Sequence, residues 1–142
     1  MNTELSRLNK LVKKQDEIYH RCAKKAGITD TQFWVLYALC EKEKGLCQNS
    51  FCENWCYSKQ TVNTAVANLE KAGLVQLSYA EGSHKRKDIL LTPQGRAFCR
   101  QHIETLIQTE QNVLAALTTE ERKIFSEILE KLLNCFEKEI GE

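Results

Sequence analysis

The sequence predicts a mainly α-helical protein with one small β-hairpin. Proline and glycine are scarce, one and six in 142 residues, so few positions interrupt a helix. Apolar residues recur at spacings of three and four along most of the chain, and they alternate with polar residues only between residues 75 and 91. The length is that of one domain with a sizeable core.

The first two helices are predicted from their apolar faces and their caps. The first helix is expected to end at Gly27. Thr29 and Gln32 have the spacing of a capping box, which opens a second helix that Gly45 ends. The apolar face of the first helix consists of Leu5, Leu8, Leu11, Val12, Gln15, Ile18, Tyr19 and Cys22, and that of the second of Phe33, Trp34, Leu36, Tyr37 and Cys40.

The middle of the chain predicts two shorter helices followed by the hairpin. A short helix is expected over about Gln48–Cys56, and another over Ser58–Ala72, with Ser58 as N-cap and Gly73 as the stop. The alternating runs 75–79 and 89–91 predict two strands joined by turn residues. A polar helix followed by a hairpin is typical of DNA-binding folds.

Two long helices are expected to complete the chain. Thr92 and Pro93 supply an N-cap and a first-turn proline for a helix to about Leu117, and Thr118 with Glu121 caps a final helix. The first and last helices have more apolar surface than a small core absorbs. This surplus predicts a homodimer, and packing of the helices within one subunit is the alternative.

The helix over Ser58–Ala72 has the properties of a recognition helix, the second helix of a helix-turn-helix, which lies in the major groove. Gln60 and Asn63 have side chains suited to adenine, and Ser58 and Thr61 suit phosphate oxygens. The candidate base and phosphate contacts on this helix are Ser58, Lys59, Gln60, Thr61, Asn63 and Thr64. An ordinary amphipathic surface helix is the alternative.

A basic cluster at the tip of the predicted hairpin supports the DNA-binding hypothesis. The cluster consists of His84, Lys85, Arg86 and Lys87. Residues 58–100 carry seven Lys/Arg against three Asp/Glu, a net charge of +4, and residues 101–142 carry four against nine, a net charge of −5. A basic middle beside an acidic end favours a polyanionic partner for the middle, although solvated faces can also segregate in this way.

Three motifs in this order resemble the MarR family of winged helix-turn-helix regulators. They are Phe51-Cys52-x-x-Trp55-x-Tyr57-Ser58-x-x-Thr61-Val62, then Leu69-x-x-x-Gly73-Leu74-Val75, then Leu91-Thr92-Pro93-Gln94-Gly95. The resemblance implies a single domain over residues 1–142. Residues 29–92 would form the DNA-binding lobe, and residues 1–27 and 93–142 the dimerisation helices. It also implies a homodimer on double-stranded DNA with a pseudo-palindromic operator.

Two parts of the chain, the wing and the helix-turn-helix turn, depart from the family pattern. The wing of the family usually carries Asp-x-Arg, and Ser83 and Lys85 occupy those positions here, so either Lys85 or Arg86 would enter the minor groove. Lys85 lacks the planar fork of arginine. Cys56 stands where the helix-turn-helix turn often has glycine, so the backbone there should be either less extreme or strained.

The seven cysteines are expected to remain thiols, because their number is odd and no export signal precedes them. Burial without chemistry is expected for Cys40, Cys52, Cys56, Cys99 and Cys135. A redox role is considered for Cys47, at the start of the short helix, and for Cys22. Peroxide-sensing relatives carry their reactive cysteine where this chain has Ser6-Arg7, which argues against a direct transfer of that role.

A small-molecule effector is implied by the family resemblance, with Tyr19, Trp34, Tyr37 and His102 as the candidate pocket. Aromatic residues at helical spacing are also common core residues. No cofactor or metal is expected, since the three histidines have no ligand spacing. No run approaches the roughly 18 apolar residues of a membrane span, and the N-terminus lacks a signal sequence, so a cytoplasmic protein is expected.

The function predicted is therefore a sequence-specific transcriptional regulator, a repressor released by a small molecule or by thiol oxidation. The alternative is a winged-helix module that binds another protein and not DNA, which the altered wing and the net charge of +1 would suit. No nucleophile–base pair or phosphate loop is evident, so an enzyme is not expected.

Overall fold

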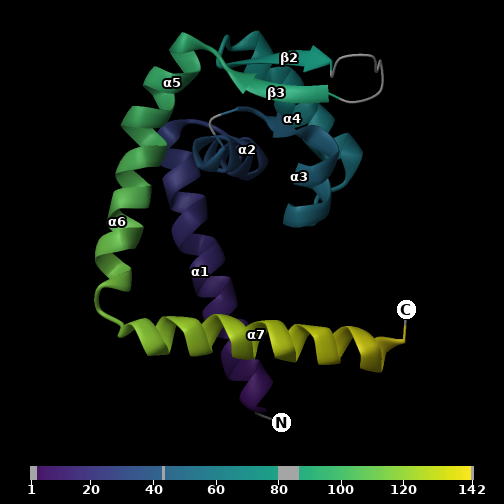
Figure 1. Ribbon diagram of the computed structural model, residues 1–142, viewed down its shortest axis with the longest axis vertical. Helices are drawn as coiled ribbons and strands as arrows, with labels where there is room; N and C mark the ends of the chain where they lie inside the picture. The colour runs from purple at the N-terminus through teal and green to yellow at the C-terminus, as the bar shows by residue number, and fades with distance from the viewer. Residues whose placement is uncertain (1–2, 43, 80–86, 142) are drawn as a thin grey trace. The chain divides into compact units, whose positions relative to one another are not determined.

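A computed structural model describes residues 3–42, 44–79 and 87–141 (Figure 1). It confirms the mainly helical fold with a small antiparallel sheet. The elements are α1 Glu4–Ala26, α2 Asp30–Glu41, β1 Leu46–Cys47, α3 Gln48–Trp55, α4 Lys59–Lys71, β2 Val75–Tyr79, β3 Lys87–Leu91, α5 Pro93–Cys99, the π-helical turn η1 Arg100–Glu104, α6 Thr105–Leu114 and α7 Thr119–Ile140.

The chain falls into two compact units, residues 1–106 and residues 107–142. The first unit contains α1 to α5, η1 and the sheet, and the second contains α7 and most of α6. None of the described helices combines the length and the hydrophobicity that crossing a membrane requires.

Local capping signals place the end of α1 and the starts of α2 and α7 where the sequence predicts them. Gly27 ends α1 in the left-handed region at φ 77°. Thr29 and Gln32 form both hydrogen bonds of the capping box at the start of α2, and Thr118 and Glu121 do the same at the start of α7. These side chains satisfy amide groups that the first helical turn leaves without a backbone acceptor.

Three details differ from the sequence-based expectation. The α2 helix ends at Glu41 and not at Gly45, because Lys42 is already extended at φ −126°. The chain then forms β1, which was not predicted, since two residues are too few to show alternation. The long helix from Pro93 contains a π-helical turn over Arg100–Glu104, and its last segment ends at Leu114 rather than near Leu117.

The sheet has the strand order β1-β3-β2, and all neighbours are antiparallel. Leu77 of β2 and Leu46 of β1 both pair with Ile89, which is fully buried at the centre of the sheet. The hairpin of β2 and β3 thus confirms the predicted wing, and β1 covers the edge of β3 that the hairpin leaves open.

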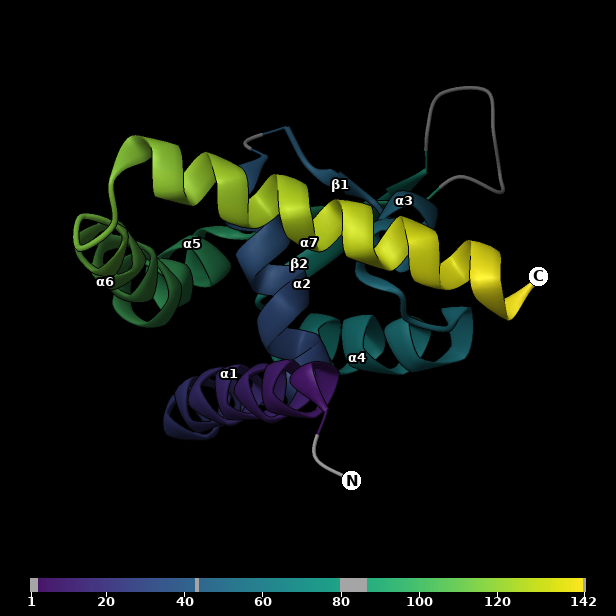
Figure 2. The same cartoon turned by 90° about the horizontal axis from the view of Figure 1, so that it is seen from below.

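The core of the first unit is built around α2, which contacts α1, α4, α5 and η1. Figure 2 shows α2 beside α1 and α4. Apolar residues recur along α2 on more than one side, which suits a helix buried on several faces. The largest side chains buried in this core are Phe33, Phe51, Leu36, Leu69, Ile89, Ile103, Val35, Val62, Val66 and Val75.

Candidate nucleic-acid interface

The turn between α3 and α4 is a tight left-handed bend at Cys56. Its backbone has φ 56° and ψ 42°, the one positive φ among the described residues other than glycine. The amide groups of Cys56 and Tyr57 both donate to the Cys52 carbonyl, which closes the end of α3. Of the two expectations for this position, strained backbone rather than a relaxed angle is what the structure shows.

The α4 helix separates an apolar face from a polar one, as its sequence predicts. Its buried residues are Val62, Ala65, Val66 and Leu69. The six predicted contact residues, Ser58, Lys59, Gln60, Thr61, Asn63 and Thr64, are all exposed. They occupy the N-terminal half of the helix, where backbone amide groups and the helix dipole favour phosphate.

Hydrogen bonds within this surface fix several of the polar side chains. The Ser58 hydroxyl accepts the Thr61 amide at 3.1 Å and donates to the Thr61 hydroxyl at 2.8 Å. The Thr64 hydroxyl donates to the Gln60 carbonyl at 3.1 Å, so its proton is committed to the helix. The N-terminal turn of α4 is therefore ordered before a partner arrives, which lowers the entropy cost of binding.

Asn63 has a partner that the sequence did not suggest. Gln48 of α3 is 7% exposed, and its side-chain amide donates to the Asn63 carboxamide oxygen. Adenine recognition by asparagine uses that oxygen as acceptor and the amide nitrogen as donor. The bond to Gln48 therefore weakens the bidentate adenine prediction for Asn63 and leaves Gln60 as the better candidate.

The wing is described only at its base. Tyr79 pairs with Lys87 at the last described rung of the hairpin, and Lys87 is half-buried. The other predicted wing contacts, His84, Lys85 and Arg86, lie outside the described residues, as does Ser83.

The base of the wing is held to α4 through Thr92. The Thr92 hydroxyl donates to the Gly73 carbonyl at 2.5 Å and accepts the Gly95 amide at 3.0 Å. It thereby joins the end of α4 to the start of α5. A Cβ atom on Gly95 would lie 1.9 Å from the Leu74 carbonyl oxygen, so this close approach admits only glycine. These two contacts explain why threonine and glycine stand three residues apart in Leu91-Thr92-Pro93-Gln94-Gly95.

Three of the four candidate effector residues lie together. The Trp34 ring is 4.8 Å from the Tyr19 ring and 5.2 Å from the Tyr37 ring, measured between centroids. His102 does not join them, because its position in η1 places its ring 4.6 Å from Phe98. A cavity of about 280 Å³ lies beside the aromatic group and is lined by Asp16, Tyr19, His20, Asp30, Trp34 and Tyr57.

The burial of the cysteines differs in part from the expectation. Cys52 and Cys99 are buried as expected, and Cys40 is half-buried, but Cys56 and Cys135 are exposed. Cys56 lies in the turn between α3 and α4, and Cys135 lies on α7. Cys47 is the N-cap residue of α3, and both Cys47 and Cys22 are half-buried. The described residues contain no cluster of three or more metal-ligating side chains.

A helix, a left-handed turn, an exposed polar helix and a hairpin stacked on it define a winged helix-turn-helix protein. The family model that matches residues 26–87 is that of the MarR family. The HTH-type transcriptional repressor Mb2911 of Mycobacterium bovis is 29% identical over 106 residues, which cover 75% of this chain and 76% of that protein.

Solved structures agree over nearly the whole chain. NMB1585, a MarR family regulator of Neisseria meningitidis, superposes with a TM-score of 0.85 at 23% identity, covering 99% of this chain and 98% of that one. The MepR–DNA complex of S. aureus superposes with a TM-score of 0.74 at 22% identity, covering 96% and 99%. The chain is therefore similar to the MarR family over residues 26–87, and it shares the winged helix-turn-helix fold of these solved structures.

Proposed function

We propose that the protein is a homodimeric repressor that binds a pseudo-palindromic DNA operator. The observation that carries this proposal is the N-terminal half of α4, where six polar residues are exposed and the opposite face is buried. Each recognition helix would enter a major groove, and the two half-sites would lie about 34 Å apart. Gln60 would read bases, and Ser58, Lys59 and Thr61 would contact the backbone phosphates.

Exposed apolar side chains support the homodimer. Six large apolar side chains on α7 are 43–66% exposed in the single chain: Ile124, Phe125, Ile128, Leu133, Phe136 and Ile140. On α1, Leu5, Leu11, Val12 and Ile18 are also exposed. Contiguous apolar surface of this kind marks a protein interface. The proposed dimerisation segments are therefore residues 1–27 and 93–142, which flank a DNA-binding lobe of residues 29–92.

A small aromatic effector would bind in the cavity beside Tyr19 and Trp34. Aromatic rings line part of it, and Asp16, His20 and Asp30 supply polar groups, which is the mixture that ligand sites favour. The His20 ring and the Asp30 carboxylate lie 2.8 Å apart and join α1 to the start of α2. A ligand that separates them would alter the position of α1 against the DNA-binding lobe and release the operator.

Selection of genomic fragments by the purified protein, followed by gel shifts at several salt concentrations, tests this function. We expect a palindromic site whose binding weakens steeply with salt. Gln60→Ala should change base preference, and Lys85→Ala with Arg86→Ala should weaken all sites. Lys138→Ala, on α7, serves as the charge control. Capture of a protein partner with no preferred DNA would instead support a protein-binding module.

A further inference from the structure

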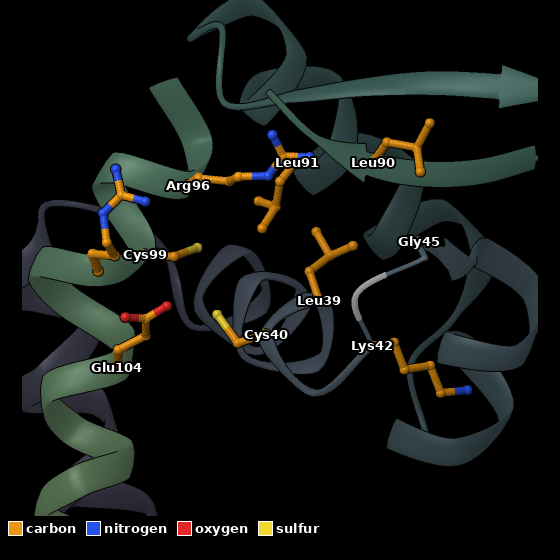
Figure 3. Close-up of a pocket in the computed structure, with 10 residues that line it drawn as sticks. Leu39, Cys40, Lys42, Gly45, Leu90, Leu91, Arg96, Cys99 and Glu104 are labelled. Atoms are coloured by element: carbon orange, nitrogen blue, oxygen red, sulfur yellow. The ribbon is translucent and has the colours of Figure 1, made fainter. Parts of the chain in front are cut away.

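Two cysteine side chains from different helices meet inside the first unit. Cys40 lies near the end of α2, and Cys99 is the last residue of α5. Their thiol groups share a hydrogen bond, and Figure 3 shows both side chains directed into the space between their two helices. The 58 residues between them in the sequence make this contact a product of the tertiary fold.

The pair lies on the wall of a cavity of about 390 Å³. Cys99 is 2% exposed, whereas Cys40 is half-buried, so a small molecule in the cavity reaches Cys40 first. Three cationic residues and one carboxylate line the cavity, which therefore favours neutral or anionic reagents. The lining residues are Leu39, Cys40, Lys42, Gly45, Leu90, Leu91, Arg96, Cys99, Arg100 and Glu104 (Figure 3).

An irregular turn follows Cys99 directly. The π-helical turn Arg100–Glu104 interrupts the long helix and supplies Arg100 and Glu104 to the cavity. π-Helical turns are rare and recur at functional sites, because the wider turn changes the direction of nearby side chains. This turn is thus a second irregularity at the same place as the thiol pair.

The two thiols differ in acidity. The hydrogen bond from Cys99 lowers the pKa of Cys40, and burial and the carboxylates of Glu104 and Glu41 oppose this effect. The same hydrogen bond, followed by burial, raises the pKa of Cys99. Cys40 is therefore the more readily ionised of the two, and the thiolate is the form of cysteine that attacks an oxidant.

We propose that Cys40 and Cys99 are a redox-active dithiol that a peroxide entering the cavity converts to an intrachain disulfide. In the first step the Cys40 thiolate attacks a peroxide oxygen, an S–O bond forms, and the O–O bond breaks. The leaving oxygen takes a proton and departs as water or an alcohol. Cys40 is then a sulfenic acid, oxidised by two electrons.

In the second step the Cys99 sulfur attacks the Cys40 sulfur. The S–S bond forms, the S–O bond breaks, and the departing hydroxide takes the Cys99 proton and leaves as water. Overall, two thiols and one peroxide yield one disulfide, one water and one alcohol, or two waters from hydrogen peroxide. Reduction by an external thiol reverses the change.

The disulfide would tie α2 covalently to the end of α5, next to the base of the wing. Leu90 and Leu91 of β3 line the same cavity, so a shift of α5 toward α2 presses on the strand that carries the wing. The effect of oxidation on operator binding rests on the proposed function, whereas the disulfide itself does not. Cys40 and Cys99 would then carry the thiol-oxidation signal, in place of Cys47 or Cys22.

The experiment treats the fully reduced, full-length protein with one equivalent of hydrogen peroxide, blocks the remaining thiols with N-ethylmaleimide and maps the peptides by mass spectrometry. We expect a Cys40–Cys99 cross-linked peptide that dithiothreitol removes. Cys40→Ser and Cys99→Ser should each abolish it, and Cys135→Ser, at an exposed cysteine on α7, should leave it unchanged. In Cys99→Ser, dimedone should trap a sulfenic acid on Cys40.

Recovery of Cys40 and Cys99 as maleimide adducts while another cysteine is oxidised overturns the proposal, and so does cross-linking of Cys40 to a second chain. Because wild-type protein gives this result, unfolding of a variant cannot obscure it. Operator binding is then compared before and after oxidation. Absence of DNA binding by the reduced protein contradicts the proposed function alone. If the reduced and the oxidised protein bind the operator equally well, the disulfide has no regulatory effect, even where the mass map has shown that it forms.

Discussion

Replacement of Cys56 by glycine should stabilise the protein, because Cys56 is in the left-handed region at φ 56°. An L-residue with a Cβ atom loses about 1–2 kcal/mol in this conformation. Glycine avoids that loss but gives up about 0.5–1 kcal/mol of conformational entropy on folding. Cys56 is exposed, so little packing is lost with its side chain. The expected net gain is about 0.5–1 kcal/mol in the free energy of unfolding.

Urea unfolding under reducing conditions, at one fixed protein concentration because a dimer is expected, measures this gain. With a slope of about 2 kcal/mol/M, the midpoint should rise by about 0.25–0.5 M. Cys56→Ala is the matched control, since it removes the thiol but keeps the Cβ atom, and its midpoint should stay near that of the wild type. A Cys56→Gly midpoint no higher than that of Cys56→Ala would refute the argument from backbone strain.

Three further substitutions test the contacts that position the proposed DNA-binding surface. Gly95→Ala should lower the free energy of unfolding by about 2–3 kcal/mol, because its Cβ would lie 1.9 Å from a backbone carbonyl oxygen; an unchanged thermal midpoint contradicts this. Thr92→Val removes two partly buried hydrogen bonds and should lower the free energy of unfolding by about 2 kcal/mol. Thr118→Val, at an exposed cap, should lower it by less, and a larger loss for Thr118→Val in urea unfolding contradicts the prediction. Gln48→Leu removes the hydrogen-bond donor to Asn63. Selection on randomised operators should then show a changed base preference at one position of each half-site. The same base preference as the wild type would show that this hydrogen bond has no part in base recognition.

Local signals explain why so much of the fold is predictable from this sequence. The caps at Thr29, Ser58, Thr92 and Thr118 each involve partners within three residues, so spacing alone identifies them. The buried face of α4 follows from one periodic pattern in the same way. The β1 strand was missed because it depends on pairing with β3, more than 40 residues later in the chain.

The candidate site was less predictable, because its chemistry depends on which distant side chains meet. Periodicity put Asn63 on the polar face of its helix, but only the packing of α3 on α4 shows that Gln48 engages its oxygen. His102 has the right residue type for a ligand pocket, yet the π-helical turn places it beside Phe98. Residue type and helical phase therefore predicted that Asn63 is exposed, but they did not predict the partners of Asn63 and His102.

The reactivity of the cysteines also depends on partners that the sequence does not predict. A sequence argument assigns reactivity to a cysteine at a helix N-terminus, where amide groups favour a thiolate, and Cys47 does occupy that position in α3. Cys40 and Cys99 lie within helices and were expected only to pack. Their hydrogen bond makes each thiol the determinant of the other's pKa, and the adjacent cavity gives an oxidant access to Cys40. A disulfide also needs two sulfur atoms in contact, and the fold brings those of Cys40 and Cys99 together, so oxidation of this pair can join α2 to the helix that follows the wing.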